Sequence, residues 1–358
     1  MGEQTKRALI LSGGGGRGAY HCGVLEYLEI IGWKPDILVG TSIGAINSAA
    51  IASGHNAKTL KSLWRSLTTN KVQRFRDDLL DVFEWRYLLD NSPWRQSMVE
   101  QCWFDFDRIN GAQSPTLAVT ATDIHTGTLT IFCNRDLEPG KSGLPRSKRV
   151  RRVEFSMDHI IASCSIPVVY PWTEIAAEQA SYWDGAVVSN TPLGTALRAG
   201  ATEMIVVLLS PWGDHEVSAS ARAEPPKLWA MPGLALDWAL LASFRSDLKL
   251  LDTVNNFVAA FELLDEAQRQ TLAQTLWPGQ EEGRRAERLR KLDRWRRVQS
   301  PWIIAPQELL PIEQIITYDR DMHEEMFDRG RSDAARILRS WRRNDAVQSS
   351  SGTSATTS

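Results

Sequence analysis

The stretch DILVGTSIGAINSAA, residues 36–50, limits the folds open to this chain more than any other feature. Its apolar run Ile37–Val39 predicts a buried strand, and the small-residue run near its end predicts a helix. The turn between them has the pattern Gly-x-Ser-x-Gly, in which a strained strand-to-helix turn pushes the serine hydroxyl outward. Gly40 and Gly44 supply the small residues that such close packing needs. We interpret Ser42 as a nucleophile, and an N-capping serine in a tight turn is the alternative.

Other short apolar runs predict an α/β fold. Strands are expected at 8–11, 37–39, 116–121 and 205–209, with helices between them at 19–31, 43–53, 57–67, 157–165 and 192–199. Residues 128–133 follow a turn containing Gly127, so they predict a hairpin with the strand at 116–121. The sheet is therefore expected to be mixed.

Composition and the pattern of apolar residues divide the chain into four regions. Residues 1–210 carry the strand and helix pattern of a core, and 211–300 indicate a mainly helical insertion or lid. Residues 301–343 return to the core through the run WIIAP and a helix from about 319 to 342. The tail 344–358 is polar enough to predict disorder.

Composition excludes several classes of function. A formal net charge of -2 with mixed signs argues against bulk binding of nucleic acid. The four cysteines are far apart and form no metal-binding or disulfide pattern: Cys22, Cys102, Cys133 and Cys164. The first apolar run is too short for a signal peptide, which predicts residence in the cytoplasm. The oligomeric state is not indicated.

The glycine-rich stretch GGGGRGAY follows the first predicted strand. Its spacing matches the G-x-G-x-x-G fingerprint of dinucleotide-binding proteins, but the same amides could hold the oxyanion of a carbonyl under attack. The dinucleotide hypothesis needs an acidic residue at the far end of the second strand, whereas Asp36 precedes that strand. A Walker A loop is excluded because Ala19 follows Gly18 where a lysine is required. No cofactor is therefore expected.

A serine nucleophile needs a base, and the histidines are poorly placed for a Ser-His-Asp triad. His215 lies in a region rich in proline, alanine and serine, and His323 lies in a charged helix. Asp184 instead follows a short aromatic strand and precedes Gly185 and Ala186, whose small size allows close approach. An ordinary Asp-Gly turn is the alternative for this aspartate alone. A carboxylate is a weaker base than imidazole, so a Ser/Asp dyad depends strongly on stabilising the oxyanion.

In this order, SGGGGRG, GTSIG and DGA resemble the motifs of the patatin-like phospholipase family. ASCSIPVVYPW and NTPLGTALRAGATEMIVV are similar to family segments on either side of the aspartate, and the likeness covers about residues 6–210. The resemblance implies a three-layer α/β/α fold with a mixed, mainly parallel sheet. It also implies Ser42 as nucleophile and Asp184 as base, with Gly185 and Ala186 completing the aspartate motif. The oxyanion hole would be built from Gly13, Gly14, Gly15, Gly16, Arg17 and Gly18, with the Gly14 and Gly15 amides at its core and Arg17 adding positive potential.

The resemblance further implies hydrolysis of fatty-acyl esters of phospholipid or another acyl lipid, through an acyl-enzyme and without a metal. A catalytically silent lipid-binding or scaffold module is the alternative. Peripheral membrane contact is a further hypothesis, based on the basic clusters 146–152 and 284–297, the second with an apolar stripe at Leu289, Leu292 and Trp295. Solvated helical faces are the alternative for both clusters. The apolar stretch 228–244 is interpreted either as a lid or acyl-chain groove or as core.

Overall fold

The computed structural model describes residues 5–75, 86–137, 149–212, 231–293 and 295–351. A nine-stranded sheet forms the centre, in the order β11-β10-β1-β2-β5-β6-β7, with β9 added beside β5 and β8 beside β9. The strands are β1 (Arg7–Leu11), β2 (Ile37–Thr41), β5 (Thr116–Asp123), β6 (Leu129–Cys133), β7 (Arg149–Arg152), β8 (Thr173–Ile175), β9 (Ala180–Asp184), β10 (Glu203–Val207) and β11 (Trp302–Ile304).

The sheet is mixed and mainly parallel. β2, β1, β10 and β11 run parallel to one another, and β5 joins β2 in the same direction. β6 pairs antiparallel with β5, which confirms the hairpin expected from Gly127. β9 also runs antiparallel to β5 and brings the chain back toward the end of β2. The parallel strands end together, so the loops after β1, β2 and β10 gather at one edge of the sheet.

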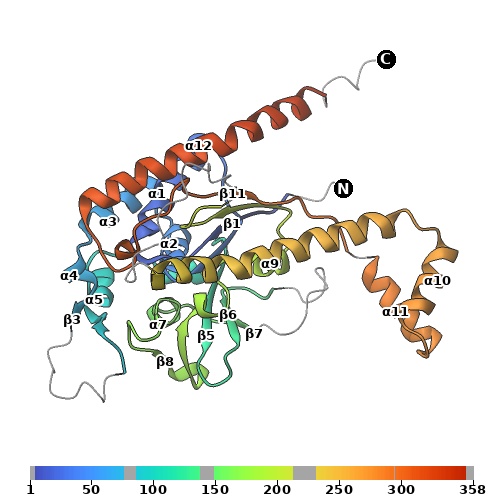
Figure 1. Ribbon diagram of the computed structural model, residues 1–358, viewed down its shortest axis with the longest axis horizontal. Coiled ribbons are helices and arrows are strands. Elements are labelled where there is room, and N and C mark those ends of the chain that lie inside the picture. The colour runs from blue at the N-terminus through green and yellow to red at the C-terminus, as the bar shows by residue number, and fades with distance from the viewer. Residues whose placement is uncertain (1–4, 76–85, 138–148, 213–230, 294, 352–358) are drawn as a thin grey trace.

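Helices cover both faces of this sheet, which confirms the three-layer α/β/α class. Alternate residues of β1 face opposite layers: Leu9 and Leu11 pack into one core, and Ala8 and Ile10 into the other. The first layer holds α1 (Ala19–Ile30), α2 (Ile43–Ala52), α3 (Ala57–Ser66), α7 (Met157–Ala162) and α12 (Arg320–Ser351), and the second holds α8 (Leu193–Arg198) and the first part of α9 (Met231–Glu262) (Figure 1). The remaining short elements near the first layer are α4 (Thr69–Val72), β3 (Arg74–Phe75), β4 (Leu89–Asp90), α5 (Ser92–Glu100) and α6 (Phe106–Asn110).

The long helix α9 connects the sheet to a helical hairpin that projects away from it (Figure 1). Near its start, Leu241 and Phe244 are buried in the same core as β1. Near its end, Phe261 packs with residues of α10 (Glu266–Leu276) and α11 (Glu282–Leu292) in a small separate cluster. The buried contacts of Leu241 and Phe244 favour the core interpretation of the stretch 228–244, of which residues 228–230 lie outside the described residues.

The C-terminal segment packs against the sheet and its first helix layer. β11 adds to the sheet beside β10, and α12 packs along α1. α12 runs on to Ser351, so residues 344–351 are helical where the polar composition predicts disorder. Extending a formed helix by one residue is far easier than nucleating a new one, which explains this difference. Residues 352–358 lie outside the described residues. Within the described ranges, no helix is long and apolar enough to cross a membrane.

Candidate active site

Ser42 occupies the sharp turn between β2 and α2. Its backbone has φ 56° and ψ −128°, a combination that is strained for a residue with a side chain. The neighbouring glycines are required by contact: a methyl group on Gly40 would lie 2.4 Å from the Gly44 carbonyl oxygen. One on Gly44 would lie 2.1 Å from the carbonyl oxygen of Leu11 in β1. The turn is therefore held between two strands and a helix, in the arrangement of a nucleophile elbow.

The strained turn is supported by a serine from another part of the chain. The backbone N–H of Ser42 donates a 2.8 Å hydrogen bond to the hydroxyl oxygen of Ser163, which is completely buried just after α7. Sequence reasoning did not assign a role to Ser163, although the segment that contains it was among those resembling the family. Ser163 therefore holds the Ser42 backbone through this hydrogen bond.

Asp184 is the last residue of β9, and its backbone N–H, its backbone carbonyl and its carboxylate each form a hydrogen bond. Its N–H donates to the Ser165 carbonyl at 2.9 Å, and its carbonyl accepts a 2.9 Å hydrogen bond from the Thr122 hydroxyl. The carboxylate accepts a 2.8 Å hydrogen bond from the Ala186 N–H. Gly185 lies so close to β5 that a methyl group there would be 2.4 Å from the side-chain oxygen of Thr120. The DGA motif is therefore hydrogen-bonded and closely packed against β5.

Burial makes Asp184 an unusual carboxyl group. Only 2% of its surface is exposed, and this desolvation raises its pKa from 3.8 to about 7. Hydrogen bonding with the Ser42 side chain and the Ala186 N–H lowers the pKa but does not cancel the effect of burial. Ser42 itself is 5% exposed. The geometry thus places a hydroxyl and a carboxyl with a pKa near neutrality together in a site shielded from water, which suits general base catalysis.

The glycine loop after β1 lies directly beside the elbow. A methyl group on Gly13 would be 2.9 Å from the Ser42 β-carbon. The Gly13 N–H already donates a 2.8 Å hydrogen bond to the side-chain oxygen of Asn190. In the described part of the chain, by contrast, the N–H groups of Gly14 and Gly15 donate to no other residue. These two amides, which the sequence places at the core of the oxyanion hole, are therefore among those of the loop for which the described residues provide no acceptor.

Close packing explains most of the glycines in this loop. Gly15, in a left-handed conformation with φ 59°, would place a methyl group 1.8 Å from the Ile315 carbonyl oxygen. A methyl group on Gly16 would lie 2.1 Å from the Thr317 carbonyl oxygen, and one on Gly18 would lie 2.4 Å from Ile43. The loop, which includes the short helix η1 (Gly15–Gly18), is thus covered by the segment around η7 (Ile312–Ile315). Sequence reasoning, which assigned these glycines to the oxyanion hole, did not include this contact.

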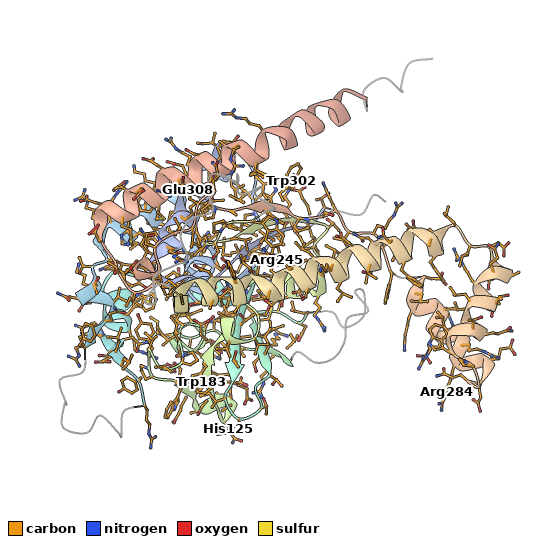
Figure 2. All side chains as sticks on the ribbon, viewed as in Figure 1. His125, Trp183, Arg245, Arg284, Trp302 and Glu308 are labelled. Carbon is orange, nitrogen blue, oxygen red and sulfur yellow. The ribbon has the colours of Figure 1, made fainter. Side chains whose placement is uncertain are left out.

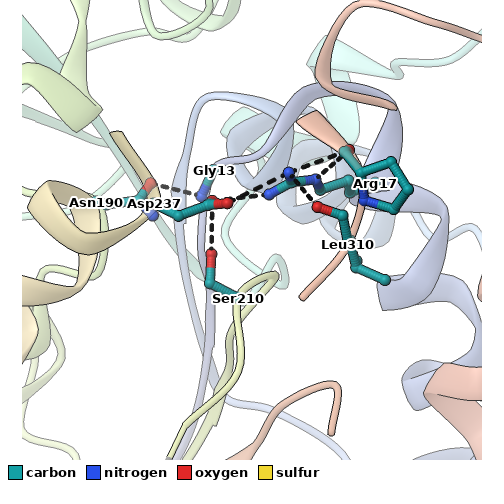
Figure 3. Close-up of polar contacts among 7 residues, drawn as sticks. Gly13, Arg17, Asn190, Ser210, Asp237 and Leu310 are labelled. Atoms are coloured by element: carbon teal, nitrogen blue, oxygen red, sulfur yellow. Dashed lines mark hydrogen bonds and ion pairs between the residues drawn. The ribbon is translucent and has the colours of Figure 1, made fainter. Parts of the chain in front are cut away.

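The Arg17 side chain forms buried contacts with α9 and with the segment before η7. Its guanidinium group is 1% exposed and forms an ion pair of 2.8 Å with Asp237 of α9 (Figure 3). It also donates hydrogen bonds of 2.8 Å to the Leu310 carbonyl and 3.1 Å to the Pro311 carbonyl. Its charge is therefore balanced by a buried carboxylate, and its contribution of positive potential to an oxyanion hole stays a prediction.

The described histidines form other contacts. His21 is buried beside Asn47, and desolvation lowers its pKa to about 3. His323 packs edge-on against Trp64, and burial lowers its pKa to about 4. Across the described ranges, no histidine hydrogen-bonds to Ser42, and no three His, Cys, Asp or Glu side chains converge as metal ligands do. His215 lies outside the described residues.

The two basic clusters form different kinds of contact within the described residues. The apolar stripe of 284–297 faces inward: Leu289 is buried against α9 and α10, and Trp295 lies 6.1 Å from the Phe257 ring. The stripe therefore contributes to the packing of the helical hairpin, on which Arg284 lies far from the sheet (Figure 2). In the first cluster, Arg151 and Arg152 belong to β7 and form ion pairs with acidic residues, whereas residues 146–148 lie outside the described residues.

With this geometry established, comparisons identify the family. A model of the patatin-like phospholipase family matches residues 9–197, which include the glycine loop, the elbow and the aspartate motif. The match spans more than half of the 358 residues, and the chain belongs to this family.

Three individual relatives share about a quarter of their aligned residues with this chain. The chain is 27% identical to the uncharacterized protein YqhO of Bacillus subtilis over 221 residues, covering 56% of this chain and 70% of that protein. It is 26% identical to the uncharacterized protein YjjU of Escherichia coli, over 57% of this chain and 52% of that protein. It is 25% identical to lysophospholipase NTE1 of Scheffersomyces stipitis, over 56% of this chain but 11% of that much longer protein.

Proposed function

We propose that this protein is a serine acyl hydrolase that cleaves fatty-acyl esters of membrane lipids. The observation that carries the proposal is the buried Asp184 carboxyl beside the hydroxyl of Ser42, at a strained turn next to the glycine loop. Membership in the patatin-like phospholipase family supports a lipid ester as substrate. Similarity to a protein named lysophospholipase NTE1 supports the same substrate class.

The reaction follows from the proton that Asp184 can accept. The Ser42 oxygen attacks the ester carbonyl carbon, and its proton passes to the Asp184 carboxylate. The carbonyl oxygen becomes an oxyanion that the Gly14 and Gly15 N–H groups stabilise by hydrogen bonds. Asp184 returns the proton to the departing alcohol or lysolipid, which leaves the acyl group on Ser42. Asp184 then removes a proton from water, whose oxygen attacks the acyl-enzyme carbonyl, and returns that proton to the Ser42 oxygen as the fatty acid leaves.

Low exposure of the two side chains contributes to this chemistry. A carboxylate with a pKa of about 7 is a stronger base than an ordinary aspartate and is half ionised near neutral pH. Hydrogen bonds to an oxyanion are also stronger where water is excluded. Cytoplasmic residence stays a prediction, as does peripheral contact with a membrane.

The proposal is tested by incubating the purified protein with mixed membrane lipids and measuring released fatty acid and lysolipid by mass spectrometry. Release that disappears in Ser42→Ala is the expected result, and the released species identify the lipid class. Ser48→Ala is the matched control, because Ser48 is a buried serine of the same helix α2. Release that is equal in the wild type and Ser42→Ala would contradict the proposal.

A further inference from the structure

The ion pair between Arg17 and Asp237 connects the glycine loop to a helix that the sequence assigned to an insertion. Two guanidinium nitrogens of Arg17 face the two carboxylate oxygens of Asp237, at 2.8 and 3.4 Å. Asp237 also accepts a 2.9 Å hydrogen bond from the hydroxyl of Ser210, just beyond the end of β10. Figure 3 shows these groups meeting at one point from three parts of the chain. All three side chains are buried.

We propose that Asp237 is a positioning residue of the active site, which acts through Arg17 to hold the glycine loop in its oxyanion-binding conformation. This inference rests on the proposed function. Arg17 follows Gly14 and Gly15 by only two or three residues, and those glycines have φ values of 156° and 59°. Glycine has little intrinsic preference for such conformations, so the loop needs an external anchor to point its N–H groups in a fixed direction.

The contact that anchors the glycine loop needs both the guanidinium group of Arg17 and the carboxylate of Asp237. A guanidinium group has several N–H donors in one plane. Those of Arg17 donate hydrogen bonds to the carboxylate of Asp237 and to the carbonyl oxygens of Leu310 and Pro311. Loss of the Asp237 charge would leave a buried cation without a counter-charge, and the loop would have to move to hydrate it. The displacement would be transmitted to the Gly14 and Gly15 amides. Helix α9 would thus be part of the catalytic unit rather than a dispensable insertion.

The test compares Asp237→Asn with the wild type by hydrogen exchange and by kinetics. Asp237→Asn keeps the size of the side chain and removes its charge. We expect amide exchange in the peptide containing residues 12–19 to rise at least about tenfold, because the loop is released. We also expect kcat to fall by about ten- to a hundredfold with KM changed less than about twofold, since a misplaced oxyanion donor acts mainly on the transition state. Asp237→Glu, which keeps the charge, should recover part of kcat.

Glu203→Gln is the matched control. It removes the ion pair of Glu203 with Arg7 at the other edge of the same sheet, and it should lower the melting temperature without changing loop exchange or kcat. If Asp237→Asn does not fold, Ser210→Ala provides a milder perturbation, because it removes only the hydroxyl that hydrogen-bonds to Asp237. It should raise loop exchange and lower kcat in the same direction.

Unchanged loop exchange in the folded variants would overturn the inference. Raised exchange with unchanged kcat would also overturn it, because the contact would then be structural only. A wild type that releases no fatty acid would overturn the proposed function and the catalytic part of this inference with it. In that case the hydrogen-exchange result would still decide separately whether Asp237 holds the loop.

Discussion

Replacing Asp184 with asparagine should stabilise the folded protein, and by more at high pH than at low pH. The side chain is buried, and its pKa is raised from 3.8 to about 7 by desolvation. Between these two values the folded chain keeps a proton that the unfolded chain releases. The stabilising contribution of the protonated carboxyl is therefore complete below pH 4 and is lost as the pH rises through 7. Asparagine has a similar shape and no charge to desolvate, so it avoids this loss.

The size of the effect follows from the two pKa values. Each tenfold difference in proton affinity corresponds to about 1.36 kcal/mol, so a rise from 3.8 to about 7 corresponds to about 4 kcal/mol at high pH. The linkage between protonation and folding gives the contribution of Asp184 to the free energy of unfolding at each pH. This contribution falls by about 3 kcal/mol between pH 5 and pH 8. A domain of this length unfolds with an entropy of roughly 0.75 kcal/mol/K, which converts the difference to about 4 °C in melting temperature.

Differential scanning fluorimetry of the wild type and Asp184→Asn at pH 5 and pH 8 measures this difference. The gain in melting temperature of the variant should be about 4 °C larger at pH 8. Asp293→Asn is the control, because Asp293 is 44% exposed and its variant should differ from the wild type by the same amount at both values of pH. A gain for Asp184→Asn that is equal at pH 5 and pH 8 would refute the argument that a buried, neutralised carboxyl lies beside Ser42.

Three further predictions concern the loop, the elbow and the base. Gly15→Ala should lower the free energy of unfolding by more than about 2 kcal/mol in chemical denaturation, since its methyl group would lie 1.8 Å from a carbonyl oxygen at a positive φ; Gly283→Ala, in open space on α11, should be neutral or stabilising. Ser163→Ala should lower kcat by about tenfold without preventing folding, since it removes the 2.8 Å hydrogen bond to the Ser42 N–H; an unchanged kcat would exclude a supporting role. The pH profile of kcat/KM should rise about tenfold per pH unit below 7 and level off above it, as Asp184 ionises; a profile that is flat from pH 5 to pH 8 would contradict its role as base.

The parts of the fold that could be predicted are those determined by residues close together in the sequence. β1, β2, β5, β6 and β10 lie where short apolar runs predicted strands, because buried parallel strands need continuous apolar residues. The turn at Ser42 could be anticipated because its glycines are required by contacts within the same strand-turn-helix unit and β1. Asp184 was recognised from its motif, although the burial that raises its pKa comes from residues throughout the fold.

The remaining features depend on contacts between distant residues. The partner of Arg17 is 220 positions away in the chain, and nothing near either residue indicates the other. Ser163 and Asn190 act on Ser42 and Gly13 over similarly large separations. The stripe on α11 suggested membrane contact as one hypothesis, because a cationic amphipathic helix has the same sequence pattern whether its apolar side meets lipid or protein. In the fold that side packs against α9 and α10.

The central claim, that Asp184 activates Ser42, is tested most directly with a fluorophosphonate probe that reacts with activated serines. Peptide mapping of the labelled wild type should place the probe on Ser42, with no label at that peptide in Ser42→Ala. The labelling rate of Asp184→Asn should be at least about a hundredfold lower, because its amide cannot accept the serine proton. A folded wild type that remains unlabelled at Ser42 would contradict the dyad and favour a catalytically silent lipid-binding module. Labelling of Ser42 that is as fast in Asp184→Asn as in the wild type would also contradict the dyad.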